Sequence, residues 1–216
     1  MKRYFITGTD TDCGKTYVTS QLVNFFANTA AIKPVASGCS FIDGQLVSAD
    51  AQQLQQNSRL SLDVINPWRF KSPVSPHIAA KEDGVELSIS EIADHCLNLQ
   101  ITGIDNLLIE GAGGLMVPLN DKETWIDFLT QTEIPVILVV GMKLGCINHA
   151  LLTETALKVN KINCAGWIAN CFNSEMLALA ENIETLKRML HVPLLGITPY
   201  SGKLAAGREL LHIMQN

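Results

Sequence analysis

The sequence lacks any apolar run long enough to cross a bilayer. Its longest strongly apolar run is IPVILVV, residues 134–140, whereas a membrane-spanning helix takes about 20 residues. The chain also passes from Met1 directly into KRYFIT, without the apolar stretch and cleavage site of a secretory signal. These absences predict a cytoplasmic protein that does not associate with a membrane.

Paired cysteines and excess positive charge are missing too. The six cysteines form no C-x-x-C pair and no Cys/His ligand pattern, which argues against structural zinc and against a disulfide framework. The formal net charge is −5, so there is no basic footprint for nucleic acid. With 47% hydrophobic and 17% charged residues, the composition is typical of a folded chain and excludes a disordered one.

The sequence does contain a regular alternation of short apolar runs and longer helical patterns. Several runs are apolar at successive positions, which is typical of parallel strands covered on both faces. We expect one doubly wound α/β domain over residues 1–216, with a mostly parallel sheet, helices on both faces, and ligands at the carboxyl ends of the strands. The predicted strands are 3–7, 30–34, 106–111, 135–141, 165–170 and 193–199. The predicted helices are 15–27, 89–101, 123–131, 147–159 and 175–190, the last with Ser174 as its N-cap, while 38–88 is predicted as loops and short helices.

The stretch GTDTDCGKT, residues 8–16, is close to a phosphate-binding loop but departs from the usual pattern. G-x-x-x-x-G-K-[ST] requires a glycine five positions before Gly14, and Thr9 stands there. The context is nevertheless right, because the stretch joins a predicted strand to a predicted helix. Backbone N–H groups at the helix N-terminus would face phosphate oxygens. Lys15 would then reach the β- and γ-phosphates of a nucleotide, and the hydroxyl of Thr16 would ligate Mg²⁺.

This variant loop resembles the G-T-D-T-x-x-G-K-T loop of dethiobiotin synthetases and of the synthetase domains of corrin amidases. The segments KPVASG, SPHIAA, EGAGG, PVILVVGMKLGCINHALLT and GWIAN also resemble dethiobiotin synthetases, in that family's order and across nearly the whole chain. The resemblance implies a P-loop type fold and an ATP-dependent cyclo-ligase of biotin biosynthesis. Such an enzyme converts 7,8-diaminononanoate, CO2 or bicarbonate, and ATP to dethiobiotin, ADP and phosphate through a phosphorylated carbamate, and works as a homodimer.

The reaction gathers negative charge in one place, so its site needs cations and oriented donors. Lys33 ends the second predicted strand. If that strand is the parallel neighbour of the first, the ammonium of Lys33 would lie beside the phosphate loop. The resemblance implies that Lys33 stabilises the carbamate and the transferring phosphoryl group, with Lys15 and Thr11 as further catalytic residues. Without the motif around it, a lysine at a strand end would be expected to be solvated.

Two carboxylates complete the predicted magnesium site. Glu110 ends the predicted strand NLLIE, where a carboxylate can ligate Mg²⁺. The resemblance gives Asp50 as the second acidic ligand, although Asp50 taken alone fits equally well as a residue at the start of a helix. Thr16, Asp50 and Glu110 together would form an oxygen-rich set suited to Mg²⁺.

The resemblance also assigns residues to the nucleotide and to the substrate. The last of the substrate-binding residues lie at the N-terminus of a predicted helix. The free N–H groups there would hold the substrate's carboxylate across the dimer interface. The expected nucleotide-binding residues are Asp12, Cys13, Gly14, Lys15, Thr16, Tyr17, Asp50, Glu110, Gly111, Ala112, Gly113, Asn170, Cys171, Pro199, Tyr200 and Ser201. The expected substrate-binding residues are Ser37, Gly145, Cys146, Ile147 and Asn148.

Three positions carry open questions. Asp12 stands where the family has glutamate, and Cys171 stands where it has aspartate, so Cys171 would loosen the discrimination between ATP and other triphosphates. Cys13 precedes a predicted helix N-terminus, a setting that activates thiols, and we hypothesise that alkylation there inactivates the protein. The alternative is an inert thiol that fills space.

Two other functions share parts of the pattern. A partitioning or cell-division regulator of the deviant phosphate-loop type would carry an extra lysine at the start of the loop, and Gly8-Thr9-Asp10 contains none. A corrin amidase would need an additional glutaminase domain. The dethiobiotin synthetase interpretation is therefore preferred to both.

Overall fold

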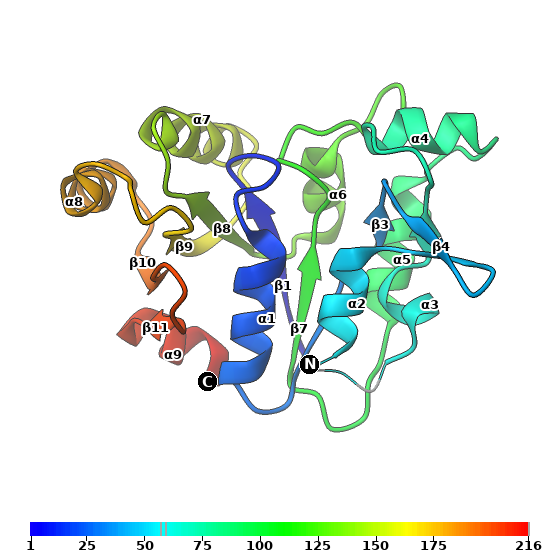
Figure 1. Cartoon of the computed structure of the whole chain (residues 1–216), viewed down its shortest axis with the longest axis horizontal. Helices are drawn as coiled ribbons and strands as arrows, with labels where there is room; N and C mark the ends of the chain where they lie inside the picture. The colour runs from blue at the N-terminus through cyan, green and yellow to red at the C-terminus, as the bar shows by residue number, and fades with distance from the viewer. Residues whose placement is uncertain (57, 59, 216) are drawn as a thin grey trace.

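A seven-stranded sheet forms the centre of the protein (Figure 1). The computed structural model describes residues 1–56, 58 and 60–215. The strand order is β11-β10-β9-β8-β1-β7-β2, and the pairings are parallel except between β10 and β11. The mostly parallel sheet predicted from the sequence is confirmed. Its strands are β1 (Lys2–Gly8), β2 (Thr29–Ile32), β7 (Asn106–Glu110), β8 (Val136–Gly141), β9 (Cys164–Asn170), β10 (Leu194–Thr198) and β11 (Ala205–Ala206).

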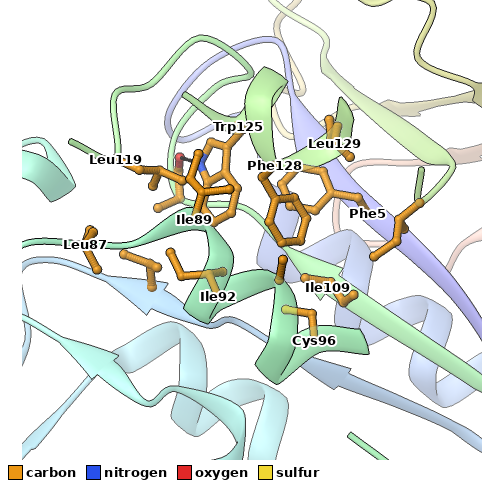
Figure 2. Close-up of a cluster of buried hydrophobic side chains, with 14 of the residues drawn as sticks. Phe5, Leu87, Ile89, Ile92, Cys96, Ile109, Leu119, Trp125, Phe128 and Leu129 are labelled. Atoms are coloured by element: carbon orange, nitrogen blue, oxygen red, sulfur yellow. Dashed lines mark hydrogen bonds between the residues drawn. The ribbon is translucent and has the colours of Figure 1, made fainter. Parts of the chain in front are cut away.

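Helices cover both faces of this sheet, as the continuously apolar strands require. Phe5 of β1 packs into one buried cluster, where its ring centroid lies 5.1 Å from that of Trp125 (Figure 2). The next residue, Ile6, packs into a second cluster with Leu22 on the opposite face. Helices α5 (Ile89–Asn98) and α6 (Trp125–Thr132) build the first cluster, and α1 (Lys15–Phe25) and α9 (Arg208–Gln215) contribute to the second. A third cluster lies under α7 (Cys146–Val159) and α8 (Leu179–Met189).

The strand order corrects one expectation about Lys33. Its strand, β2, was expected beside β1, but β2 pairs with β7, and β7 lies between the two. The residues that follow β1, β7 and β2 still meet at one edge, because parallel strands present their carboxyl ends together. The side chain that bridges the gap is Glu110, the last residue of β7.

Helix α8 begins later than predicted. Its N-cap is Ala178 rather than Ser174. The side chain of Asn173 accepts a hydrogen bond from the backbone N–H of Glu175 at 2.8 Å, forming a local turn where the helix was expected. Short polar side chains compete with helix formation in this way.

The irregular region predicted at 38–88 holds short helices and two small strand pairs. The helices are α2 (Ala49–Gln55), α3 (Leu62–Ile65) and α4 (Pro76–Glu82). In one strand pair, β3 (Val35–Ala36), just before this region, pairs with β6 (Trp68–Arg69). In the other, β4 (Ser40–Ile42) pairs with β5 (Gln45–Val47). Asp43 and Gly44 both have positive φ between β4 and β5, which is the hairpin turn that an Asp-Gly pair favours. Within the described ranges, the structure has no helix of the length and apolarity needed to cross a membrane.

Candidate functional site

The loop between β1 and α1 is built around two glycines, and this explains the departure from the usual pattern. A Cβ at Gly8 would collide with the Sγ of Cys13, so the close backbone approach falls at position 8. Thr9 instead extends the strand, since its N–H donates to the carbonyl of Val139 at 3.0 Å. Gly14 caps α1 with φ of 87°, in the left-handed region that glycine favours. The loop therefore needs no glycine at position 9.

Asn170 supports this loop from the end of β9. Its Nδ2 donates to the carbonyl of Cys13 at 2.9 Å, and a side chain at Gly14 would collide with the same amide group. Only 2% of Asn170 is exposed. The structure thus gives Asn170 a role in holding the phosphate loop, while its contact with adenine stays a prediction.

The two residues after Gly14 face different partners. Lys15 is buried, and its Nζ donates to the carbonyl of Asp10 at 3.0 Å, closing the loop on itself. The Oγ1 of Thr16 donates to Oε1 of Glu110 at 2.6 Å. The helix start is therefore fastened to the end of the neighbouring strand β7.

Lys33 lies between two carboxylates beside the phosphate loop. Its Nζ contacts Oε1 of Glu110 at 2.9 Å and also pairs with Asp50. Glu110 is fully buried, Lys33 is nearly so, and the side chain of Asp50 is 45% exposed. Burial works to lower the pKa of Lys33, but the charges of Glu110 and Asp50 outweigh it and raise this pKa well above its usual range. Burial likewise works to raise the pKa of Asp50, and Lys33 lowers it overall.

These groups surround one cavity of about 300 Å³. Two ammonium groups, two hydroxyls and two carboxylates therefore line the space in front of the α1 N-terminus. Such a set can bind a polyanion and ionic intermediates formed next to it. The residues that line the cavity are Thr11, Asp12, Gly14, Lys15, Thr16, Lys33, Asp50 and Gly113.

The oxygen atoms of Thr16, Asp50 and Glu110 fit a magnesium ion. Oε2 of Glu110 is buried and has no hydrogen-bond partner among residues 1–56, 58 and 60–215. Mg²⁺ is commonly held by one or two carboxylates together with water and substrate phosphates. The same residues contain no group of three or more His, Cys, Asp and Glu that could hold a metal ion by themselves. The fit therefore depends on the hydroxyl of Thr16 and on ligands from the nucleotide.

The segment after β7 forms a fixed wall of the site. The carbonyl of Ala112 accepts a hydrogen bond from Nε1 of the buried Trp125 at 3.0 Å. The N–H of Gly111 donates to the carbonyl of Ile6 at 3.0 Å. These bonds leave Gly113 at the cavity, close to Thr11.

The residues expected to bind the substrate lie in two places. Ser37 follows β3 and is half-buried, outside the residues that line the Lys33 cavity. The segment 145–148 opens α7, where the N–H of Cys146 already donates to the carbonyl of Lys143 at 3.0 Å. A cavity of about 430 Å³ lies between residues 8–11, residues 114–118 and one face of α7. Apolar side chains form part of its lining, as an alkyl chain requires.

The residues expected near the base occupy the other side of the loop. Cys171 is buried, and its N–H donates to the carbonyl of Thr198 at 2.8 Å. Pro199, Tyr200 and Ser201 form a turn after β10, in which Ser201 has φ of 52°. The hydroxyl of Tyr17 donates to the carbonyl of Gly202 at 2.8 Å, so α1 contacts this turn directly.

The structure favours the inert alternative for Cys13. Its side chain is 0% exposed, packed under the loop against Gly8 and Gly141. A thiol that water does not reach is a poor target for an alkylating reagent. We therefore abandon the hypothesis of a reactive thiol at this position.

One ion pair of the site was missed from the sequence. Nζ of Lys143 lies 2.7 Å from Oδ2 of Asp10 and lowers the pKa of that carboxyl group. The two residues are 133 positions apart, and neither shows a local pattern that would pair them. This pair joins the phosphate loop to the segment that leads into α7.

Sequence comparisons with known proteins give matches over nearly the whole chain. A family model described as an AAA domain matches residues 2–208. The ATP-dependent dethiobiotin synthetase BioD of Legionella pneumophila (strain Paris) is 63% identical over 205 residues, covering 95% of this chain and 97% of the relative. The protein of the same name from Pseudoalteromonas translucida is 44% identical, covering 93% and 91%.

Solved structures show the same fold at much lower identity. The MinD cell division protein of Aquifex aeolicus aligns with a TM-score of 0.56 and 15% identity, covering 99% of this chain and 86% of that one. A ParA family ATPase of Chlorobium tepidum aligns with a TM-score of 0.54 and 15% identity, covering 100% and 94%. These likenesses concern the phosphate-loop fold alone.

Proposed function

Because this chain belongs to the family of ATP-dependent dethiobiotin synthetases, we propose that it is the ligase that closes the ureido ring of dethiobiotin. One amine of 7,8-diaminononanoate adds to CO2 and loses a proton, giving a carbamate. A carbamate oxygen then takes the γ-phosphoryl group of ATP, and ADP leaves. The second amine attacks the carbamate carbon, phosphate leaves, and two C–N bonds to one carbonyl carbon have formed.

The placement of Lys33 supports this proposal most directly. A carbamate and a transferring phosphoryl group are both anionic, and Lys33 brings a buried ammonium to the carboxyl end of the strands, beside the phosphate loop. The raised pKa keeps this ammonium charged at neutral pH. Lys15 would exchange its contact with the carbonyl of Asp10 for phosphate oxygens, and Thr11 lines the same cavity.

Mg²⁺ belongs to the proposal as the ion that neutralises the triphosphate. Thr16, Asp50 and Glu110 would hold it, and Lys33 would share the two carboxylates with it. When bound, the ion supplies charge that stabilises the phosphates during transfer. The protein's own contribution is to orient the phosphate loop against β7 through the Thr16–Glu110 hydrogen bond.

A homodimer and a cytoplasmic location complete the proposal. Met116 and Leu152 border the 430 Å³ cavity and are 62% and 61% exposed, and Leu144 just before α7 is 99% exposed. Burying these side chains against a second copy would place segment 145–148 near a substrate tail. The cysteines are all free, which suits a reducing compartment.

A nucleotide-switched regulator of the partitioning type is the weaker candidate. The structures that resemble this chain include such proteins, but at 15% identity they share its fold only. The start of the loop, Gly8-Thr9-Asp10, has no lysine. The charge cluster around Lys33 lines the same cavity as the phosphate loop; it would serve an anionic substrate next to the nucleotide, which a simple switch does not need.

One assay tests the proposed activity. Purified protein is incubated with 7,8-diaminononanoate, bicarbonate and Mg·ATP, and dethiobiotin and phosphate are measured together. We expect equal amounts of both products, with phosphate release dependent on the diamine. The proposal would be contradicted if phosphate were released equally fast without the diamine and no dethiobiotin were formed. Replacing ATP by CTP or GTP tests whether Cys171 relaxes the choice of base.

A further inference from the structure

A turn next to the phosphate loop is held by side chains from α1. The hydroxyl of Tyr17 donates to the carbonyl of Gly202 at 2.8 Å, and Oε1 of Gln21 accepts from the N–H of Leu204 at 3.3 Å. Tyr17 and Gln21 are four residues apart, so they lie on the same face of the helix. The turn of residues 199–203 is thereby fixed to the same helix whose first residues form the phosphate site.

The ends of the turn are held by the pairing of β10 with β11, whereas its middle lies at the surface. The N–H of Gly202 donates to the carbonyl of Pro199 at 3.0 Å within the turn. Ser201 has φ of 52°, a conformation unfavourable for a residue with a side chain. Tyr200 is 57% exposed and Lys203 is also exposed. The hydrogen bond from Tyr17 reaches the turn at Gly202, in this surface part.

The charges of the site determine on which side of the phosphates a nucleoside must lie. Thr16, Glu110 and Lys33 gather toward β7 and β2, where the reacting groups need space. The remaining direction along the carboxyl edge of the sheet leads past β8 and β9 to the end of β10. After β10 the chain enters the turn of residues 199–203, which Tyr17 of α1 contacts directly.

We propose that Tyr17 is a positioning residue for the nucleoside: its hydroxyl holds the turn of residues 199–203 at the distance from the phosphate loop that lets the turn cover the base. The inference rests on the proposed use of ATP. It assigns to the Tyr17 side chain a contribution to base binding that acts through Gly202 and leaves phosphate binding untouched. Loss of the hydroxyl frees the turn without altering the N-terminus of α1.

Tyr17→Phe and a matched control separate this role from general structure. Tyr4 is buried, and its hydroxyl donates to the carbonyl of Ile213 in α9 at 2.8 Å, near the end of β1 that lies away from the phosphate loop. Tyr4→Phe therefore removes an equal hydrogen bond to a backbone carbonyl elsewhere. For each variant, calorimetry measures the affinity for a non-hydrolysable ATP analogue and for inorganic tripolyphosphate, which has no base.

The expected result is a split between the two ligands. A hydrogen bond to a neutral carbonyl contributes enough that Tyr17→Phe should weaken binding of the ATP analogue about two- to tenfold. Tripolyphosphate binding should be unchanged, and Tyr4→Phe should alter neither affinity. Tryptic cleavage after Lys203 should be faster in Tyr17→Phe than in the wild type or in Tyr4→Phe.

Three outcomes would overturn the inference. Equal weakening of both ligands would place the effect of Tyr17 at the phosphates, and unchanged affinities would show that the turn does not need the hydroxyl. A wild-type protein that binds the ATP analogue but forms no dethiobiotin would refute the proposed reaction and leave the inference about Tyr17 intact. A wild type that binds tripolyphosphate and the ATP analogue equally would refute the inference by showing that the base makes no contact.

Discussion

Replacing Lys33 by methionine should destabilise the protein in a way that depends strongly on pH. The substitution keeps the buried side-chain volume but removes the charge that Glu110 and Asp50 share. Removing one partner of a buried ion pair costs about 3–5 kcal/mol. The variant can limit this cost by taking up a proton on the fully buried carboxyl of Glu110. Protonating an ordinary glutamate, with a pKa of about 4.3, costs about 3.7 kcal/mol at pH 7 and about 1.6 kcal/mol at pH 5.5.

The direction of this pH dependence follows from the number of protons bound in the folded and the unfolded state. The folded variant holds a proton that the unfolded chain has released, so its stability rises as the pH falls from 7 toward 4.3. In the wild type, the ammonium of Lys33 compensates the charge of Glu110. The raised pKa of Lys33 contributes stability that is lost only at strongly alkaline pH, and the lowered pKa of Asp50 contributes stability that is lost only at acid pH.

Urea unfolding at pH 7.0 and pH 5.5 measures how much stability the substitution removes at each pH. We expect the difference in unfolding free energy between wild type and Lys33→Met to shrink by about 2 kcal/mol between the two values. The double variant Lys33→Met, Glu110→Gln is the control, because it has no buried charge left at this point and should show no such dependence. A loss of equal size at both pH values would refute the reasoning, as would a single variant as stable as the wild type.

Two further predictions concern the phosphate loop. Native protein treated with iodoacetamide should carry almost no label at Cys13, and unfolded protein should be fully labelled, because the side chain is 0% exposed; peptide mass spectrometry that finds rapid labelling of the native protein would show that the loop opens. Lys143→Met should lower the melting temperature by no more than about 2–4 °C, since an ion pair of partly exposed side chains is worth under about 1 kcal/mol. The difference from wild type should become smaller in 1 M NaCl, where such pairs are screened, and a difference that stays constant with salt would assign the loss to packing of the lysine stem.

The sequence predicted the strands of the sheet well because burial on both faces leaves a direct mark on composition. It did not predict that β7 separates β1 from β2, since strand order depends on how connections cross the sheet and not on any local pattern. The start of α8 was misplaced because Ser174 is a good N-cap by type, while the side chain of Asn173 forms a competing turn. The hairpin at Asp43-Gly44 was missed although its dipeptide signal was visible.

The candidate site likewise has features that could be predicted from the sequence and features that could not. The positions of Lys15, Thr16, Lys33 and Glu110 could be predicted because each follows a strand at the same edge. Their contacts could not, since a hydrogen bond such as that between Thr16 and Glu110 joins residues 94 positions apart. The support that Asn170 gives to the phosphate loop could not be predicted either, because it depends on the space above Gly14.

Glu110 ends a central strand that is hydrogen-bonded on both sides, to β1 and to β2. The wall that β7 provides beside the cavity is therefore as stiff as the interior of the molecule, whereas the wall expected around the nucleoside and the substrate tail, residues 199–203 and 144–148, consists of surface turns and a helix start. Attempts to redesign the protein for a longer diamine or a different triphosphate should leave the first wall untouched and vary the second. Tolerance to mutation should follow the same division, with few accepted changes at the strand ends and many in the turns.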